Sequence, residues 1–348
     1  MKKRRFLLKW INRLLLLTTI FCGLASLIPS DLFSGSGLFA LIFPTLIVPH
    51  ILFFILTLRI SFKRVLPHII GIALTFLPAM AQLPVTKPLD APDGSVRIAS
   101  YNVRAFYQSE NAASQIAAWS KKEDIDVLCM QEIRKPEEWP ISTLFSNVFF
   151  APKWSGYCVG IFSRYPIIYE ELLEFKELPG DGYPKYSAGL ADIALPWDTV
   201  RFINVHLSST GVSDGDMSVE PNADDVIVRT KDIIKKLIRS ERARGLQAKS
   251  ILQWVEESPH PLILCGDFNS VPSGNLYARL LQKMEDPYIW RGTGKMGSFE
   301  PLKRRFLPIR IDWTLHSGDF QCTDQHIEHI DYSDHYPLVT TISAPIEE

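Results

Sequence analysis

The sequence predicts a mixed α/β domain of two packed sheets covered by helices, preceded by three membrane-spanning helices. Three observations support this prediction. Long apolar segments fill the first part of the chain, short apolar runs typical of strands alternate with helical patterns after it, and several of these runs end on polar residues suited to phosphate chemistry. The 348 residues therefore divide into a membrane anchor, a linker and one large domain.

Charge separates the two main parts of the chain. Residues 1–84 contain nine Lys and Arg against a single acidic residue, Asp31, which gives a net charge of +8. The remaining residues contain 28 basic and 37 acidic side chains, which gives −9. The nearly neutral total of −1 therefore conceals a basic anchor and an acidic domain.

Three apolar segments in the anchor, at 14–28, 37–58 and 65–81, are expected to cross a bilayer. The middle segment spans 22 residues without a charge, which is long enough for a transmembrane helix. Arg13 and Arg64 can reach the membrane interface and extend the two shorter segments. Buried helices of a soluble protein are the alternative, but apolarity on nearly all sides at this length favours a bilayer.

Basic residues predict how the anchor, residues 1–83, is oriented. Lys and Arg are concentrated at the N-terminus and between 59 and 64, whereas the loop at 29–36 has none. The positive-inside rule then places the N-terminus in the cytoplasm and everything after about Gln82 outside it. In a bacterium-like cell this is a multi-pass protein of the cytoplasmic (inner) membrane with a periplasmic domain. The alternative for the first segment is a cleaved signal peptide. The other two segments would then still hold the protein in the membrane.

A linker at 84–95, rich in Pro and Gly, leads to the predicted catalytic domain at 96–346. Runs typical of strands lie near 96–102, 126–131, 157–163, 187–194, 199–206, 261–266, 309–315 and 337–343. Helical patterns lie at about 110–122, 223–257 and 275–284. Many strands mixed with a few long helices predict two packed sheets with helices on their outer faces.

The most informative run is 262–270, because it ends in a carboxylate and a carboxamide two residues apart. Side chains alternate along a strand, so Asp267 and Asn269 are expected to point the same way. Other runs also end on polar residues. These are Asn102, Glu132, Asn204, His206, Asp312, Asp334 and His335. One such ending is ordinary turn chemistry, but this many in one chain indicate a site.

The order and type of these residues resemble the endonuclease/exonuclease/phosphatase superfamily, which includes DNase I, AP endonucleases, neutral sphingomyelinases and inositol polyphosphate 5-phosphatases. The resemblance covers roughly residues 96–346 and implies a four-layer αββα sandwich. It is carried by Asn102-Val103, Gln131-Glu132, 163–166 (Ser-Arg-Tyr-Pro), 204–206 (Asn-Val-His), 266–269 (Gly-Asp-Phe-Asn), 310–312 (Arg-Ile-Asp) and 333–335 (Ser-Asp-His). Each motif alone is weak, whereas the set is specific.

Phosphodiester hydrolysis needs a nucleophilic water, neutralisation of phosphoryl charge and help for the leaving oxygen. Hard oxygen ligands favour Mg²⁺ or Mn²⁺ as the cofactor. We predict Glu132 as the principal metal ligand because a buried strand delivers it, and Asn102 as a contact to metal or phosphate.

The resemblance implies roles for the other residues. Asp267 would orient or deprotonate the attacking water, and Asn269 would hold the phosphate. Asp334 and His335 would form the other half of the site, with Asp312 paired to the histidine. Whether His335 acts as a base or stabilises the transition state stays open at this stage.

His206 helps to discriminate between branches of the superfamily. DNase I-like and sphingomyelinase-like branches have histidine here, suited to protonating a leaving oxygen or binding phosphate, whereas AP endonucleases usually have tyrosine. AP endonucleases also carry aspartate where this chain has Arg104, so an AP-endonuclease role is disfavoured. Arg164 is expected to be structural, and Asn204 to support the site from behind.

A basic helix and the cysteines leave alternatives open. Lys and Arg between 229 and 249 form either a solvated surface or a contact with anionic lipid or a nucleic-acid backbone. Cys129, Cys158, Cys265 and Cys322 match no zinc-binding spacing, and disulfide pairing does not follow from the sequence.

The sequence therefore predicts a membrane-anchored, extracytoplasmic, metal-dependent phosphohydrolase with the lipid bilayer as its partner. Its substrate is either nucleic acid or a phospholipid or small phosphodiester. Nucleic acid is the usual substrate class of the superfamily that the chain resembles, whereas the net charge of −9 opposes a polyanion and the membrane tether favours a lipid. The two classes therefore rank almost level. The alternative is a catalytically inactive binding module on the same fold, although all the site positions are present. A transporter role is weaker, because three helices with few intramembrane charges offer no ion pathway.

Overall fold

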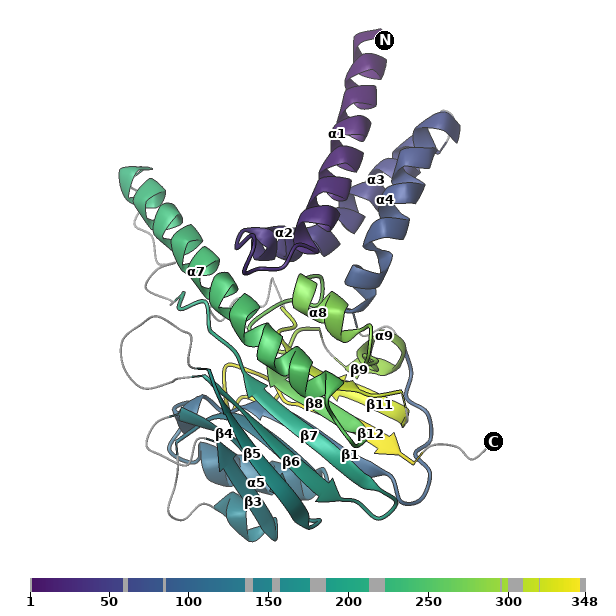
Figure 1. Cartoon of the computed structure of the whole chain (residues 1–348). Coiled ribbons are helices and arrows are strands. Elements are labelled where there is room, and N and C mark those ends of the chain that lie inside the picture. Colours follow the sequence, from purple (N-terminus) through teal and green to yellow (C-terminus); the bar gives the residue numbers. More distant parts are fainter. Residues whose placement is uncertain are drawn as a thin grey trace.

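A computed structural model gives the arrangement of the chain (Figure 1). It describes residues 2–58, 62–83, 86–134, 140–151, 157–175, 186–212, 223–294, 296–299, 309–318 and 320–344.

A seven-stranded sheet forms one layer of the sandwich, with the order β3-β4-β2-β1-β12-β11-β9. The strands are β1 (Val96–Asn102), β2 (Val127–Arg134), β3 (Asn147–Ala151), β4 (Tyr157–Ser163), β9 (Gly292–Gly294), β11 (Gln321–Ile327) and β12 (Leu338–Ser343). β1 and β2 are parallel and in register from Ile98 opposite Val127 to Asn102 opposite Gln131. Their carboxyl ends therefore lie side by side.

A five-stranded sheet forms the second layer, with the order β10-β8-β7-β6-β5. The strands are β5 (Ile167–Glu174), β6 (Ser187–Ala194), β7 (Thr199–His206), β8 (Leu262–Asp267) and β10 (Asp312–His316). β7 and β8 are parallel and end together, with His206 opposite Asp267. β10 runs antiparallel to β8, and its first residue, Asp312, also lies opposite Asp267.

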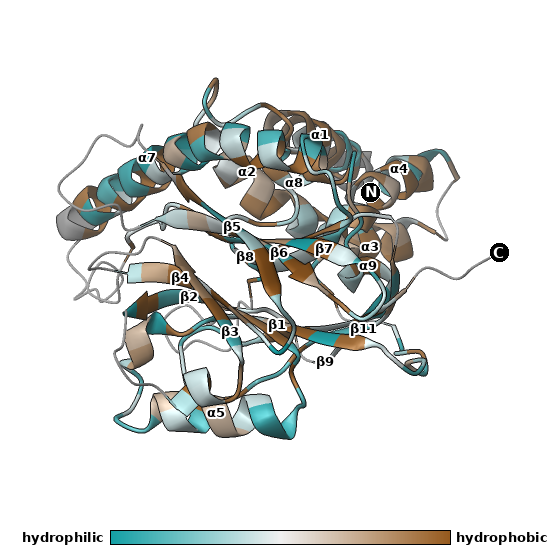
Figure 2. Cartoon of the chain, turned by 60° about the horizontal axis from the view of Figure 1, so that its bottom comes forward, coloured by the Kyte–Doolittle hydropathy of each residue, from teal (hydrophilic) through white to brown (hydrophobic). Residues whose placement is uncertain are grey.

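Helices cover the outer face of each sheet, which makes four layers (Figure 2). The predicted αββα sandwich and the three apolar helices before it are confirmed. Helix α5 (Ala112–Lys122) packs on the seven-stranded sheet, and α7 (Ala223–Glu256) and α8 (Asn275–Leu280) pack on the five-stranded sheet. Strand alternation builds the core. On β8, Leu262 and Leu264 face the helices, whereas Ile263 and Cys265 face the other sheet.

The sequence analysis did not predict four strands, namely β3, β5, β9 and β11. Three of these, β3, β5 and β9, are edge strands. An edge strand is recognised by its pairing with a neighbouring strand, because it lacks a long apolar run buried on both faces. The predicted strand near 309–315 begins later, at Asp312. Helix α9 (Tyr288–Arg291) was also missed, and the predicted helix at 275–284 ends at Leu280. All five cysteines are free.

Three helical spans precede the sandwich and are apolar enough to cross a membrane, Phe6–Ser26, Ser36–Thr57 and Phe62–Met80. The first lies in α1 (Lys2–Ser26) and the third in α4 (Phe62–Met80). The middle span combines α2 (Ser36–Ile42), the 3₁₀ turn η1 (Phe43–Leu46) and α3 (Ile47–Thr57), because Pro44 interrupts the regular helix. Shorter 3₁₀ turns, η2 (Arg104–Phe106) and η3 (Pro140–Thr143), occur in the sandwich.

The spans join the sandwich on the side covered by α7 and α8 (Figure 1). Ser30 donates a hydrogen bond to Glu241 at 2.6 Å, and Asp31 pairs with Lys249 at 2.8 Å. The loop after β8 also participates, because Ser273 donates to the Ala40 carbonyl at 2.5 Å. The linker continues this attachment, with hydrogen bonds to the strands β9 and β11 near the sheet edge.

A buried ion pair fastens the end of α4 to the sandwich. Arg310 is fully buried, pairs with Asp286 at 2.7 Å and donates to the Ala81 carbonyl at 2.8 Å. Its guanidinium also lies over the Tyr288 ring, 4.2 Å from the centroid. Tyr277 donates to Asp286 at 2.5 Å and completes the network.

We expect Asp286→Ala to lower the free energy of unfolding by about 3–5 kcal/mol, because it leaves the Arg310 charge buried and unpaired. Thermal unfolding of the full chain in detergent measures this change. Lys122→Ala, which removes an exposed ion pair with Glu123, should change stability little. Equal effects of the two substitutions would contradict the importance of the buried pair.

Candidate active site

Strand alternation directs four of the predicted site residues into the space between the sheets. Asn102 has the same parity on β1 as Ile98, and Asp267 has the same parity on β8 as Ile263 and Cys265, which all face the opposite sheet. His206 on β7 and Asp312 on β10 follow the same rule, because their outward neighbours Val205 and Trp313 face the helices. The four side chains are at most 5% exposed.

Glu132 reaches the same space by a different route. On β2, Leu128 and Met130 face helix α5, so regular alternation would also point Glu132 toward that helix. The register with β4 shifts between Met130 and Ile133, and Glu132 has a φ of 56°. This bulge turns the carboxylate inward to the site, which is a common use of bulges.

Asp267 lies at the centre of the site. Its Oδ2 accepts a hydrogen bond from Asn102 Nδ2 at 2.9 Å and lies 3.8 Å from His206 Nε2 and 3.7 Å from His335 Nε2. Burial, followed by the nearby Asp312 carboxylate, raises the pKa of Asp267 to about 6, against the opposing effects of the two histidines and Asn102.

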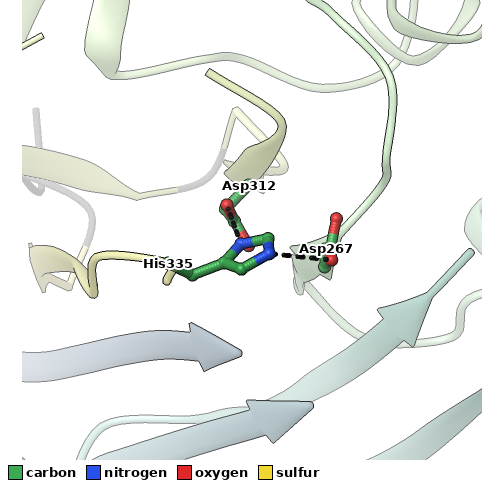
Figure 3. A group of neighbouring side chains, drawn as sticks. All are labelled: Asp267, Asp312 and His335. Carbon is green, nitrogen blue, oxygen red and sulfur yellow. Dashed lines mark hydrogen bonds and ion pairs between the residues drawn. The ribbon is translucent and has the colours of Figure 1, made fainter. Parts of the chain in front are cut away.

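His335 lies between two carboxylates (Figure 3). Its Nδ1 contacts Asp312 Oδ2 at 3.0 Å, and its Nε2 faces Asp267. Burial alone would lower the pKa of His335, but Asp312 and then Asp267 raise it to about 10. The Phe299 ring packs against the imidazole with a centroid distance of 4.7 Å and fixes its orientation from the side.

The other side of the site brings Glu132 and His206 together. Glu132 Oε1 accepts from Asn102 Nδ2 at 3.2 Å and lies 3.6 Å from His206 Nε2. This Nε2 is buried and makes no hydrogen bond with the described residues. Tyr186 packs edge-on against the His206 ring, with centroids 5.3 Å apart. Glu132 keeps 28% of its side chain exposed, so this side opens to solvent.

The donor set fits a divalent cation that prefers oxygen. Glu132 and Asp267 direct carboxylate oxygens toward the same amide and toward the buried His206 Nε2. One ligand atom each from Asp267, Asp312 and His335 also lies within 4.8 Å of the others. In this arrangement Asn102 turns its Nδ2 to the carboxylates, and its Oδ1 accepts from the Arg104 amide at 3.0 Å. Metal binding by Asn102 therefore stays a prediction.

One predicted residue, Asn269, does not follow the strand alternation that the sequence predicted. β8 ends at Asp267, and Asn269 has a φ of 49°, so strand alternation does not carry over to it. The Asn269 backbone amide instead donates to Asp267 Oδ1 at 2.8 Å, and its side chain donates to the Leu207 carbonyl. Asp334 lies at the rim, where it pairs with Arg104 at 3.2 Å.

Two other residues have the supporting positions that the sequence indicated. Arg164 pairs with Asp124 at 2.6 Å and with Asp126 at 3.3 Å, which is a structural role. Asn204 accepts from Gln131 at 2.7 Å and donates to two main-chain carbonyls on β2 and β4. It thus ties the two sheets together directly behind the site.

Sequence reasoning missed Arg104, Tyr186 and Phe299 as components of the site. Arg104 was noted only as a departure from one branch of the superfamily, and the two aromatic residues lie outside every motif. Only their packing against His206 and His335 reveals them.

Comparisons of the sequence and the structure find proteins that are similar to this chain. The sequence model described as "Endonuclease/Exonuclease/phosphatase family" matches residues 99–335. No curated protein matches the chain.

Solved structures resemble the sandwich at low identity. A functionally unknown conserved protein from Enterococcus faecalis V583 is 19% identical, with a TM-score of 0.53 over 72% of this chain and 100% of its own. An endonuclease/exonuclease/phosphatase from Bacteroides vulgatus is 16% identical, with a TM-score of 0.54 over 72% and 99%. D. rerio TDP2, solved in complex with a single-strand DNA product, is 15% identical, with a TM-score of 0.51 over 72% and 100%. At these identities the likeness shows the fold.

The raised pKa of His335 predicts how stability depends on pH. The ordinary pKa of histidine in an unfolded chain is 6.5, whereas the pKa of His335 in the folded protein is about 10. The stabilisation from the charged imidazole is therefore complete below pH 6.5 and is lost as the pH rises through about 10. The difference in free energy of unfolding between wild type and His335→Gln should therefore shrink from neutral pH upward. Thermal melts with a chelator present measure it, and a constant difference over this range would contradict the ion pairing.

Proposed function

Because the chain belongs to the endonuclease/exonuclease/phosphatase family, whose model covers residues 99–335, we propose that it is a membrane-anchored, metal-dependent phosphoester hydrolase acting outside the cytoplasm. The observation that carries the proposal is the convergence of polar side chains from both sheets. Asn102 and Glu132 come from the seven-stranded sheet, whereas His206, Asp267 and Asp312 come from the five-stranded sheet.

Glu132 is the residue that would hold Mg²⁺ or Mn²⁺, with Asn102 beside it. When bound, such a cation neutralises phosphoryl charge and lowers the pKa of coordinated water. A pKa of about 6 lets Asp267 accept a proton from the attacking water near neutral pH. His206 holds its buried Nε2 3.6 Å from Glu132 Oε1, where we place its contact with phosphate or the leaving oxygen.

His335 is suited to stabilising charge rather than to accepting a proton. With a pKa of about 10 its imidazolium persists at neutral pH, and Asp312 holds its Nδ1 side. The cationic Nε2 side then faces the region beside Asp267 where negative charge develops on the phosphoryl oxygens. Asn269 is proposed to hold the phosphate, and Asp334 to shape the rim through Arg104.

Membrane insertion explains the surfaces of the three apolar spans. On α1, Leu14, Leu17 and Leu24 each expose about two-thirds of their surface, at 66%, 64% and 64%. Such a contiguous apolar surface is unstable in water and suited to lipid. The distribution of Lys and Arg then predicts an extracytoplasmic, periplasmic sandwich in the inner membrane of a bacterium-like cell.

The attachment of the spans favours a phosphoester at the membrane surface as substrate. The loop that follows Asp267 bonds to Ala40 through Ser273, and Arg310, two residues before Asp312, bonds to Ala81. The edge of the sandwich that carries the site is therefore the edge that joins the membrane spans. A net charge of −9 after residue 84 also disfavours a long polyanion.

Nucleic acid is the second candidate substrate. The structurally similar D. rerio TDP2 was solved with single-strand DNA product, and the basic part of α7 offers positive charge. An inactive binding module is disfavoured, because the acidic and histidine positions of the site are all retained, and a chain of contacts runs from Glu132 through His206, Asp267 and His335 to Asp312.

Substrate choice is best tested with the full chain reconstituted in lipid nanodiscs with Mg²⁺. DNA, RNA, sphingomyelin and bis-nitrophenyl phosphate form the panel. We expect cleavage of the lipid and of the small diester. Cleavage of DNA or RNA alone would reject the lipid preference, and no cleavage of any member would count against the hydrolase.

We expect Glu132→Gln and His335→Gln each to lower turnover of bis-nitrophenyl phosphate by about 10²–10⁴-fold, because each removes a charge that acts at the reacting phosphate. His326→Gln is the matched control, since His326 also pairs with an aspartate, Asp324, but lies on β11. Unfolding curves verify that the variants fold. Wild-type turnover in either site variant would refute the proposed site.

Metal binding has a readout that is independent of activity. Mg²⁺ at one hundred times its dissociation constant should raise the free energy of unfolding of the wild type by about 2.7 kcal/mol. Glu132→Gln should lose most of this stabilisation, whereas Glu171→Gln on the edge strand β5 should keep it. A full stabilisation of Glu132→Gln by Mg²⁺ would place the metal elsewhere.

A further inference from the structure

Helix α7 has two halves with different surroundings. From Ser240 onward it buries Ala248, Ile251 and Val255 against the five-stranded sheet. Between 226 and 239 no residue is buried. This first half extends beyond the sheets on the side where the apolar spans leave the sandwich (Figure 1).

The first half of α7 is nevertheless strongly amphipathic. With about 100° between successive residues, its apolar side chains form one continuous side of the helix. They are Val226, Ile227, Ile233, Ile234, Leu237 and Ile238, whereas Val228 is an exposed apolar residue on the opposite side. The opposite side is basic and carries Arg229, Lys231, Lys235, Lys236, Arg239 and Arg242, with Asp232 as its one acidic residue. Ile227 is 53% exposed, and Ile234 is 39% exposed.

The exposed isoleucines continue a face of α7 that already touches the membrane spans. Ile227, Ile234 and Ile238 lie at helical spacing with Glu241 and Gly245 along one stripe. Glu241 accepts the hydrogen bond from Ser30 at 2.6 Å. Gly245 fits so closely against the chain at Asp31 that an added Cβ would lie 2.5 Å from its backbone nitrogen.

The loop at 27–35 joins the first two spans and therefore lies at the surface of the bilayer that they enter. A stripe that contacts this loop and continues outward is directed to the same surface. Basic amphipathic helices of this composition bind in the head-group region, with the apolar side inserted and the charges beside anionic phosphates.

We propose that residues 226–239 of α7, here called the interfacial half, lie in the head-group region of the bilayer and dock on anionic phospholipid. The apolar stripe enters to a depth of about 5–10 Å. A nucleic-acid backbone would use the basic side but would leave the isoleucines exposed to water, so it explains only half of the surface. The proposal depends on the membrane insertion proposed above and is independent of the hydrolase.

Spin labels in the full chain test this docking. Cys322, the one cysteine that is not fully buried, is replaced by serine, and single cysteines are then introduced as Ile234→Cys, Lys235→Cys or Leu17→Cys. Lys235→Cys is the matched control on the basic side, and Leu17→Cys reports insertion of α1. Collision rates with oxygen and with a water-soluble nickel chelate are measured in nanodiscs of phosphatidylglycerol and phosphatidylcholine.

We expect the ratio of oxygen to nickel collisions at Ile234→Cys to be several-fold higher than at Lys235→Cys, and to rise with the fraction of phosphatidylglycerol. Equal, water-like ratios at both positions, with Leu17→Cys still in lipid, would overturn the docking. Protection of Ile234→Cys from both reagents would show that protein, either another part of the chain or a second copy, covers the stripe, and would also overturn it.

Discussion

The site depends on one buried carboxylate. Asp267 is 1% exposed, and an unpaired charge at such a position is strongly unfavourable. Asn102 from the opposite sheet, the Asn269 amide and the imidazoles of His206 and His335 surround it. Compensation of this charge therefore draws groups from both sheets into one place, and these are the groups that we propose for phosphoester hydrolysis.

Local strain in β2 completes the site. A non-glycine residue with positive φ is unfavourable, and Glu132 adopts a φ of 56° within a bulge. Gln131 lies in the same bulge and bonds to Asn204 behind the site, so the sheets are held together just where the strand departs from regular pairing. This strained bulge turns the Glu132 carboxylate toward the site, whereas regular alternation would point it toward helix α5.

The apolar spans are continuous with the site through hydrogen bonds rather than through a flexible tether alone. Ala40 and Ala81 accept bonds from residues close in sequence to Asn269 and Asp312. Ala40 also shares an apolar cluster with Ile311 and Phe299, and Phe299 packs on His335. The orientation of the spans and the packing of the His335 imidazole are therefore linked by direct contacts.

The sequence by itself determined the two packed sheets with helices outside them and the apolar spans, because hydrophobic periodicity is a local property. The resemblance to a known superfamily supplied the four layers and the polar residues predicted for the site. The sequence did not determine the edge strands β3, β5 and β9, which pairing defines, or the orientation of Asn269, whose positive φ ends the alternation of β8. Tertiary structure alone decided that Arg104 pairs with Asp334 and that Tyr186 and Phe299 flank the two histidines. These contacts join residues far apart in the chain, and no local pattern encodes a distance between strands of different sheets.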